Sequence, residues 1–128
     1  MVYQQKVEEM KQHYEESAKY YENANRAPNE RVRQESQRGG DEAYAKGAKV
    51  AEEAKKEVRS EACKEAQGYY DKQEAAYKKG DFKAAKEYQQ KGDKTMEEGQ
   101  KKEKEIDREQ KQAEYKAQEK MQGLERTR

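Results

Sequence analysis

The chain has few of the residues that build large cores and chemical sites. Its 128 residues include one cysteine, one histidine and no tryptophan, and isoleucine, leucine and phenylalanine occur once each. A single cysteine excludes an internal disulfide and a cysteine metal cluster, and zinc sites need several His or Cys ligands. No Gly-rich phosphate loop is present either. We therefore expect neither a metal nor an organic cofactor.

Long apolar runs are also absent. No stretch approaches the roughly 20 apolar residues that span a bilayer, and the first residues lack the apolar core of a signal peptide. Together with the single cysteine, this pattern predicts a soluble protein of a reducing compartment, without a membrane partner. We expect the cytoplasm, with the nucleus as the alternative.

Catalytic groups are equally scarce. His13 stands alone, and a general acid or base needs a partner and a pocket. Cys63 lies on or beside an alanine-rich helix face, where a small packing residue is the expected role. Since no catalytic constellation exists, we predict that the protein is not an enzyme.

Charged residues and helix formers are what the chain does contain. Charged residues make up 45% of it, yet the net charge is only +1, and ten tyrosines accompany abundant alanine. Glu, Lys, Gln, Ala and Arg favour helices, whereas a core of Ala and Tyr is thin. We predict an all-α protein of long, exposed helices, with a mostly disordered solvating chain as the alternative. Interleaved charges predict solvated faces and no basic block.

The first segment has a clear heptad pattern. Seven residues alternate three and four positions apart and therefore share one helix face. They are Tyr3, Val7, Met10, Tyr14, Ser17, Tyr21 and Ala24. The partner helix lies either in this chain or in a second copy, which would make a homodimer through Tyr3, Val7, Met10 and Tyr14.

Breaks after this segment suggest a domain boundary. Pro28 ends the first helix, and a short polar helix follows at about residues 29–37. Gly39-Gly40 is expected to break the chain, with Asp41 as the N-cap of the next helix. We therefore predict one domain at residues 1–40 and a second at 41–128.

The second predicted domain is an antiparallel helical hairpin. Residues 41–79 contain no proline, and Gly80-Asp81 supplies a helix stop followed by an N-cap. The last helix should run from Phe82 to about Gln122. Phe82 and Met96 lie on one sevenfold row of its apolar seam. Polar residues interrupt the seam beyond Met96, so the C-terminal extension is expected to be solvent-exposed.

A faint internal repeat accompanies these elements. Tyr20-Tyr21-Glu22 resembles Tyr69-Tyr70-Asp71, and residues 46–53 resemble residues 91–98. A true duplication would give two related helical hairpins. Chance similarity in a chain rich in Lys and Glu is the alternative.

Residues 59–92 carry a family resemblance. The pattern consists of Arg59, Ala62, Tyr70, Ala76, Tyr77, Gly80, Asp81, Ala85 and Gly92. It resembles the helical domain of unknown function that precedes Smr (small MutS-related) domains. The resemblance implies a helical hairpin that acts near RNA or ribosome-linked machinery.

The departures from this family limit what the resemblance implies. Glu65, Thr95 and Gly99 stand where the family tends to carry His, His and Met. The Smr domain itself, to which the family's nuclease or RNA-binding activity is ascribed, is missing. A second, weaker resemblance of residues 75–88 is to a tetratricopeptide hairpin, but the 34-residue period is absent.

Tyrosines and one arginine are the candidate partner-binding residues, since aromatic rings can stack on RNA bases. The candidates are Tyr20, Tyr21, Arg59, Tyr69, Tyr70 and Tyr77. The competing interpretation is that tyrosines fill gaps in a core poor in aliphatic residues. The sequence thus predicts a non-catalytic helical interaction module with a protein or RNA partner. The alternative is a self-associating coiled-coil structural protein.

Overall fold

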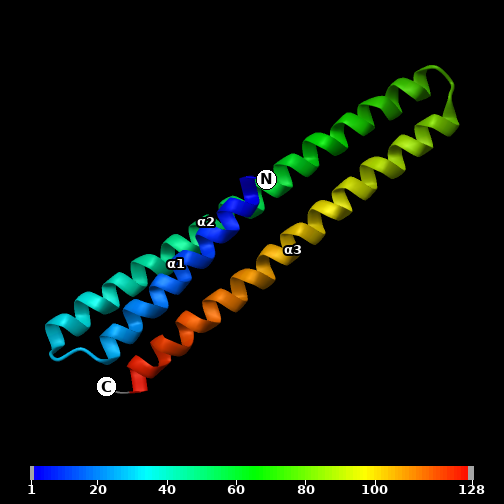
Figure 1. Cartoon of the computed structure of the whole chain (residues 1–128). Helices are drawn as coiled ribbons and strands as arrows, with labels where there is room; N and C mark the ends of the chain where they lie inside the picture. Colours follow the sequence, from blue (N-terminus) through cyan, green and yellow to red (C-terminus); the bar gives the residue numbers. More distant parts are fainter. Residues whose placement is uncertain (1, 127–128) are drawn as a thin grey trace. The chain divides into compact units, whose positions relative to one another are not determined.

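Three α-helices form the structure, a computed structural model that describes residues 2–126. They are α1 (Val2–Asn25), α2 (Glu30–Lys78) and α3 (Phe82–Arg126), and this range contains no strand (Figure 1). The predicted all-α fold is confirmed. Within the same range, no helix has an apolar stretch long enough to cross a membrane.

The turn at Gly80-Asp81 lies where the sequence predicts it. Gly80 has a φ of +76°, the left-handed conformation that glycine adopts without steric cost. Its N–H donates to the Tyr77 carbonyl at 3.0 Å, and the Asp81 N–H donates to the Ala76 carbonyl at 2.9 Å. This pair of bonds is a Schellman motif, which satisfies the last carbonyls of α2. The Asp81 carboxylate then accepts from the Ala84 N–H at 3.1 Å and caps α3.

The break predicted at Gly39-Gly40 is wrong. The chain after Pro28 begins α2 at Glu30, with Asn29 as its N-cap, and the helix continues through both glycines. There is consequently no separate short helix at residues 29–37, and Asp41 is not an N-cap. Each helical glycine costs about 1 kcal/mol, but tyrosine rings of α1 pack on this pair, and that packing offsets the cost.

The chain divides into two compact units. Unit 1 comprises Met1–Ala54 and Ile106–Arg128, and unit 2 comprises Lys55–Glu105. Helices α2 and α3 each contribute to both units, whereas α1 belongs to unit 1. The division therefore falls at different positions from the boundary at residues 40 and 41 expected from the sequence.

Unit 1 is a three-helix arrangement with the heptad face of α1 in its core. Met10, Tyr14 and Ser17 have no exposed surface, and Val7, Tyr21 and Ala24 are also buried. Residues of α2 and α3 complete this core, namely Ala43, Val50, Ala51, Ala54, Ile106, Ala117 and Leu124. The partner of the α1 face is thus this chain itself.

Two expectations change as a result. The distal part of α3 does not project into solvent, because Ile106 and Leu124 are each 1% exposed. A homodimer through the α1 face would have to open unit 1, since Val7, Met10 and Tyr14 are already covered.

Unit 2 is a two-helix hairpin with a core of small side chains. Its buried apolar residues are Val58, Ala62, Ala66, Ala76 and Ala85. The helices approach closely, because a Cβ added at Gly99 would lie 2.6 Å from the Cβ of Ala62. Small side chains bury little apolar area, so unit 2 has less hydrophobic stabilisation per residue than unit 1.

Candidate interaction surface

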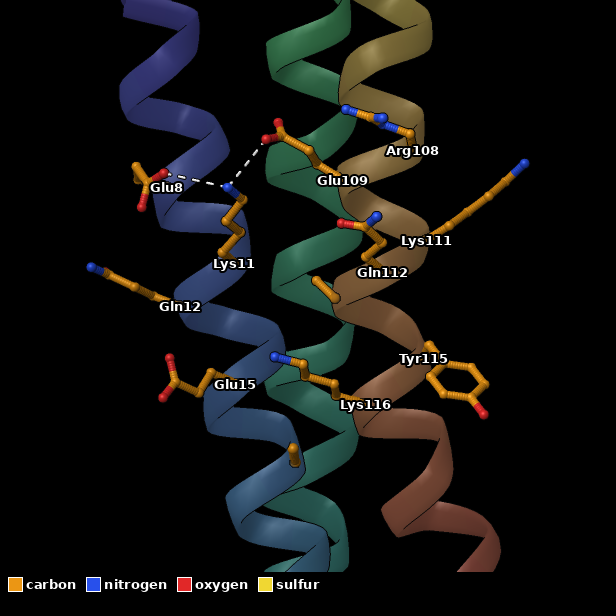
Figure 2. Close-up of a pocket in the computed structure, with 12 residues that line it drawn as sticks. Glu8, Lys11, Gln12, Glu15, Arg108, Glu109, Lys111, Gln112, Tyr115 and Lys116 are labelled. Carbon is orange, nitrogen blue, oxygen red and sulfur yellow. Dashed lines mark hydrogen bonds and ion pairs between the residues drawn. The ribbon is translucent and has the colours of Figure 1, made fainter.

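Unit 1 has an open groove of about 1200 Å³ between α1 and α3 (Figure 2). Its lining carries four basic and three acidic side chains, together with Ala18 and Ala113. Lys11 bonds Glu109 at 3.2 Å and Glu8 at 3.5 Å, and its hydrogen bond to Glu109 raises the pKa of the ammonium. An open groove with nearly balanced charge favours neither sign of ligand charge.

His13 and Cys63 are the single histidine and the single cysteine of the chain. The His13 Nε2 lies 3.6 Å from a carboxylate oxygen of Glu9, and Cys63 is exposed on α2. Residues 2–126 contain no cluster of three His, Cys, Asp or Glu side chains that could hold a metal ion.

Tyr21 has a structural role. Its ring lies on Gly40, where an added Cβ would come within 2.6 Å of the ring. Its hydroxyl donates to Asp41 at 2.5 Å, and burial, with that hydrogen bond, raises its pKa. Only 1% of Tyr21 is exposed, so its side chain is not accessible to a partner while unit 1 is folded, which disfavours the expected partner-binding role.

Tyr70 repeats this arrangement in unit 2. Its ring lies on Gly92, again with an added Cβ within 2.6 Å, and its hydroxyl donates to Asp93 at 2.6 Å. The second tyrosine of each Tyr-Tyr pair in the sequence repeat therefore makes an equivalent contact with a glycine. The second pair of similar segments is not equivalent, because Gly92 corresponds in its contacts to Gly40, whereas Gly47 packs on Tyr14.

Buried tyrosines also make stability depend on pH. Burial is the main cause of the raised pKa values of Tyr14 and Tyr21, whose ordinary value is 10.0. A pKa raised by folding gives stability that is present below the unfolded pKa and lost as the pH rises through the folded value.

We therefore expect the free energy of unfolding to fall as the pH rises above about 10. The Tyr14→Phe/Tyr21→Phe variant should show a shallower fall, because it lacks the two shifted groups. Urea unfolding followed by circular dichroism over a pH series measures this. Tyr77→Phe/Tyr115→Phe, at two exposed positions, is the control. Equal slopes for the two double variants would contradict the assignment.

The other candidate residues are accessible, but the structure does not bring them all together. Tyr20 is 37% exposed, and its ring lies on Gly39. Arg59 pairs with Glu103 at 2.7 Å, an exposed ion pair that contributes roughly 0–1 kcal/mol. The 18 helical positions between Arg59 and Tyr77 correspond to about 27 Å along α2. Arg59 thus does not share a site with Tyr77.

Tyr69 belongs to a cluster of rings and lysines that joins the two helices of unit 2. The Lys72 Nζ lies 5.8 Å from the ring centroid of Tyr69 and 5.9 Å from that of Tyr88. The Lys91 Nζ lies 5.8 Å from the Tyr88 centroid. These distances are typical of cation–π contacts, which contribute about 0.5–1 kcal/mol at exposed positions.

Tyr77 forms the most open aromatic contact of unit 2. Its ring centroid lies 5.7 Å from that of Phe82 across the turn, and the two side chains are 50% and 66% exposed. The sevenfold row predicts Phe82 on the apolar seam of the last helix, but Phe82 is exposed. Its position directly after the Asp81 cap was the available signal, since a first-turn residue has no preceding helical turn beside it.

Lysines are frequent in the sequence around these rings. We call residues 69–91, which include the turn, the hairpin end. Between residues 72 and 91 the sequence has six lysines and three acidic residues, although the whole chain has a net charge of only +1. The lysines are Lys72, Lys78, Lys79, Lys83, Lys86 and Lys91.

Most of this positive charge has no local counterion. Within residues 2–126 only Lys78 of the six has a carboxylate in ion-pair range, Glu74 at 3.7 Å. A count of charges in short windows would have revealed this excess, which the interleaved charges of the whole chain conceal.

Comparison with known proteins gives no further assignment. No protein-family model, no curated protein and no solved structure matches the chain at a significant level. The resemblance of residues 59–92 to the Smr-associated helical domain stays a prediction.

Proposed function

We propose that this chain is a non-catalytic helical interaction module that associates with RNA or with ribosome-linked machinery. The observation that supports the proposal is the hairpin end of unit 2, where exposed aromatic rings coincide with an excess of lysines. Nucleic-acid binders combine these two features, because phosphates attract cations and bases stack on rings. The resemblance of residues 59–92 to a domain that accompanies Smr domains points in the same direction.

The remaining surfaces of the described chain offer less to a partner. The unit 1 groove is balanced in charge and bridged by the Lys11–Glu109 pair. The heptad face of α1 is covered by the chain itself, which disfavours the alternative of a self-associating coiled coil.

The experiment is crosslinking in the cells that express the protein. Irradiation followed by purification of the tagged chain should recover covalently attached RNA, and ribonuclease should release any co-purifying ribonucleoprotein. A variant with Tyr77→Ala and Phe82→Ala provides the internal comparison. The proposal would be contradicted if the chain were recovered without RNA, or if an untagged culture yielded as much RNA as the tagged one.

A further inference from the structure

We infer that single-stranded RNA binds across the hairpin end, with its bases stacked on Tyr77 and Phe82. Its phosphates would contact Lys79, Lys83 and Lys86. This inference rests on the proposed association with RNA and adds the contact residues and the form of the ligand.

The geometry of the two rings suits stacking on separate bases. Tyr77 lies in the last turn of α2 and Phe82 begins α3, so the turn holds both rings at the same end of the hairpin. Their planes are inclined by 59°, which leaves each ring with accessible surface that the other does not cover. Bases in a duplex are stacked on one another, so only a single strand can present its bases to these rings.

The surroundings of the rings favour a nucleic acid over a protein helix. In the described part of unit 2, Tyr77 and Phe82 are the only large apolar side chains that are well exposed. A docking helix needs a continuous apolar strip for its own apolar face. Here lysines flank the rings, and a strand that alternates planar bases with phosphates matches this arrangement better.

The three lysines are available to an anionic ligand. Lys79, Lys83 and Lys86 are exposed, and none has an ion pair within residues 2–126. Asp81, the acidic residue nearest to Lys79 and Lys83 in the sequence, is used as the cap of α3, and Glu87, which follows Lys86, makes no ion pair with it. Lys72 and Lys91 add positive charge at the hairpin end while they lie over the Tyr69 and Tyr88 rings.

The test is fluorescence anisotropy with the full chain and a labelled oligouridylate of about 12 nucleotides, a length within the usual range of such sites. Tyr77→Ala and Phe82→Ala should each weaken binding about tenfold. The Lys79→Gln/Lys83→Gln/Lys86→Gln variant should lower the slope of log affinity against log salt by about 0.7 per lost contact. All five positions are exposed, so circular dichroism should show unchanged folding.

Matched controls come from the same chain. Tyr115→Ala removes an equally exposed ring of unit 1. A second control is Lys94→Gln/Lys101→Gln/Lys104→Gln, which removes three exposed lysines of unit 2 away from the turn. Both should leave the affinity within about twofold of the unmodified chain and the salt slope close to it. Single-stranded DNA of the same length should bind comparably, because stacking and phosphate contacts do not read the 2′-hydroxyl.

Each of the following results would overturn the inference. If the ring variants bind as tightly as the unmodified chain, the bases do not stack on Tyr77 and Phe82, although the proposed association with RNA would survive. Equal affinity for a duplex of the same length, or for an oligoglutamate peptide, would show that charge alone is recognised. If the chain binds no single strand but is crosslinked to RNA in cells, the inference fails while the proposed function stands. If neither the anisotropy assay nor the crosslinking detects RNA, both the inference and the proposed function fail.

Discussion

The Met10→Asp variant is expected to lose about 4 kcal/mol or more of its free energy of unfolding. Met10 has no exposed surface and lies in the core of unit 1. The substitution creates a cavity and also places a carboxylate where it has no partner, two of the mechanisms that give the largest single-residue effects. Whole domains are stable by only about 5–15 kcal/mol, so this loss is a large fraction of the total. Urea unfolding followed by circular dichroism measures the loss.

Gln12→Asp is the matched control for this prediction. It introduces the same charge on the same helix, but Gln12 is exposed and its change should lie within about 0.5 kcal/mol of zero. Similar losses for the two variants would mean that the charge of α1, and not burial of Met10, determines the effect.

The same pair of variants shows whether the heptad face of α1 packs within the chain or against a second copy. If α1 packs within the chain, the stability of the unmodified protein and the loss in Met10→Asp are independent of protein concentration. In a homodimer through Tyr3, Val7, Met10 and Tyr14, both would vary with concentration. Unfolding at two widely separated concentrations, with sedimentation measurements beside it, gives a direct answer.

The sequence predicts those parts of the fold that depend on local signals. The three-four spacing on α1 places Val7, Met10 and Tyr14 on one face whatever the partner helix is, and the structure buries that face. At Gly80 and Asp81, the helix stop and the cap are properties of the residues themselves. Both predictions are confirmed for this reason.

Contacts between segments that are distant in the sequence explain why two other predictions were wrong. Gly39-Gly40 has the composition of a helix break, and only the rings of Tyr20 and Tyr21 on another helix show why it continues a helix. The C-terminal part of α3 has too few apolar residues to suggest burial. It is buried because Ile106 and the residues after it meet a face of α1 whose partner the pattern left undetermined.

The candidate surface could be predicted only in part. Tyr69 and Tyr77 were named from the sequence and lie at the hairpin end, whereas Phe82 and the lysines around it were missed. The sevenfold row placed Phe82 on the apolar seam, but a side chain in the first turn of a helix can point past the end of the helix it packs against. The burial of Tyr21 was missed for a similar reason, since burial depends on the neighbouring helix as well as on the residue.

A double-mutant cycle on Tyr21 and Gly40 should show a reversal of sign. In the unmodified chain, Gly40→Ala is expected to cost up to about 2 kcal/mol. Overpacking costs about 1–3 kcal/mol, and the better helix propensity of alanine returns about 1 kcal/mol. The three nearest atoms to the added Cβ all belong to the Tyr21 ring, which is buried and cannot move aside cheaply.

Removal of the ring should make the same substitution favourable. Tyr21→Ala alone should cost about 3–5 kcal/mol, the range for large aromatic truncations. In that background Gly40→Ala should stabilise by up to about 1 kcal/mol, since the clash is gone and only the propensity difference is left. Gly68→Ala is the control, because no atom lies within 4 Å of its added Cβ, and it should stabilise equally in both backgrounds. A cost for Gly40→Ala that persists without the ring would contradict the packing account.

The corresponding cycle in unit 2 should give a smaller coupling. Gly92 meets the Tyr70 ring at the same 2.6 Å, but Tyr70 is only half-buried and its hydroxyl bond to Asp93 is exposed. The ring can therefore turn toward solvent when Gly92→Ala is introduced, at the loss of one exposed hydrogen bond of about 0.5–1.5 kcal/mol. Urea unfolding of the four variants measures the coupling. A coupling as large as that of Tyr21 and Gly40 would contradict this expectation. It would show that the distance between ring and glycine, and not the burial of the ring, determines the cost of the Gly→Ala substitution.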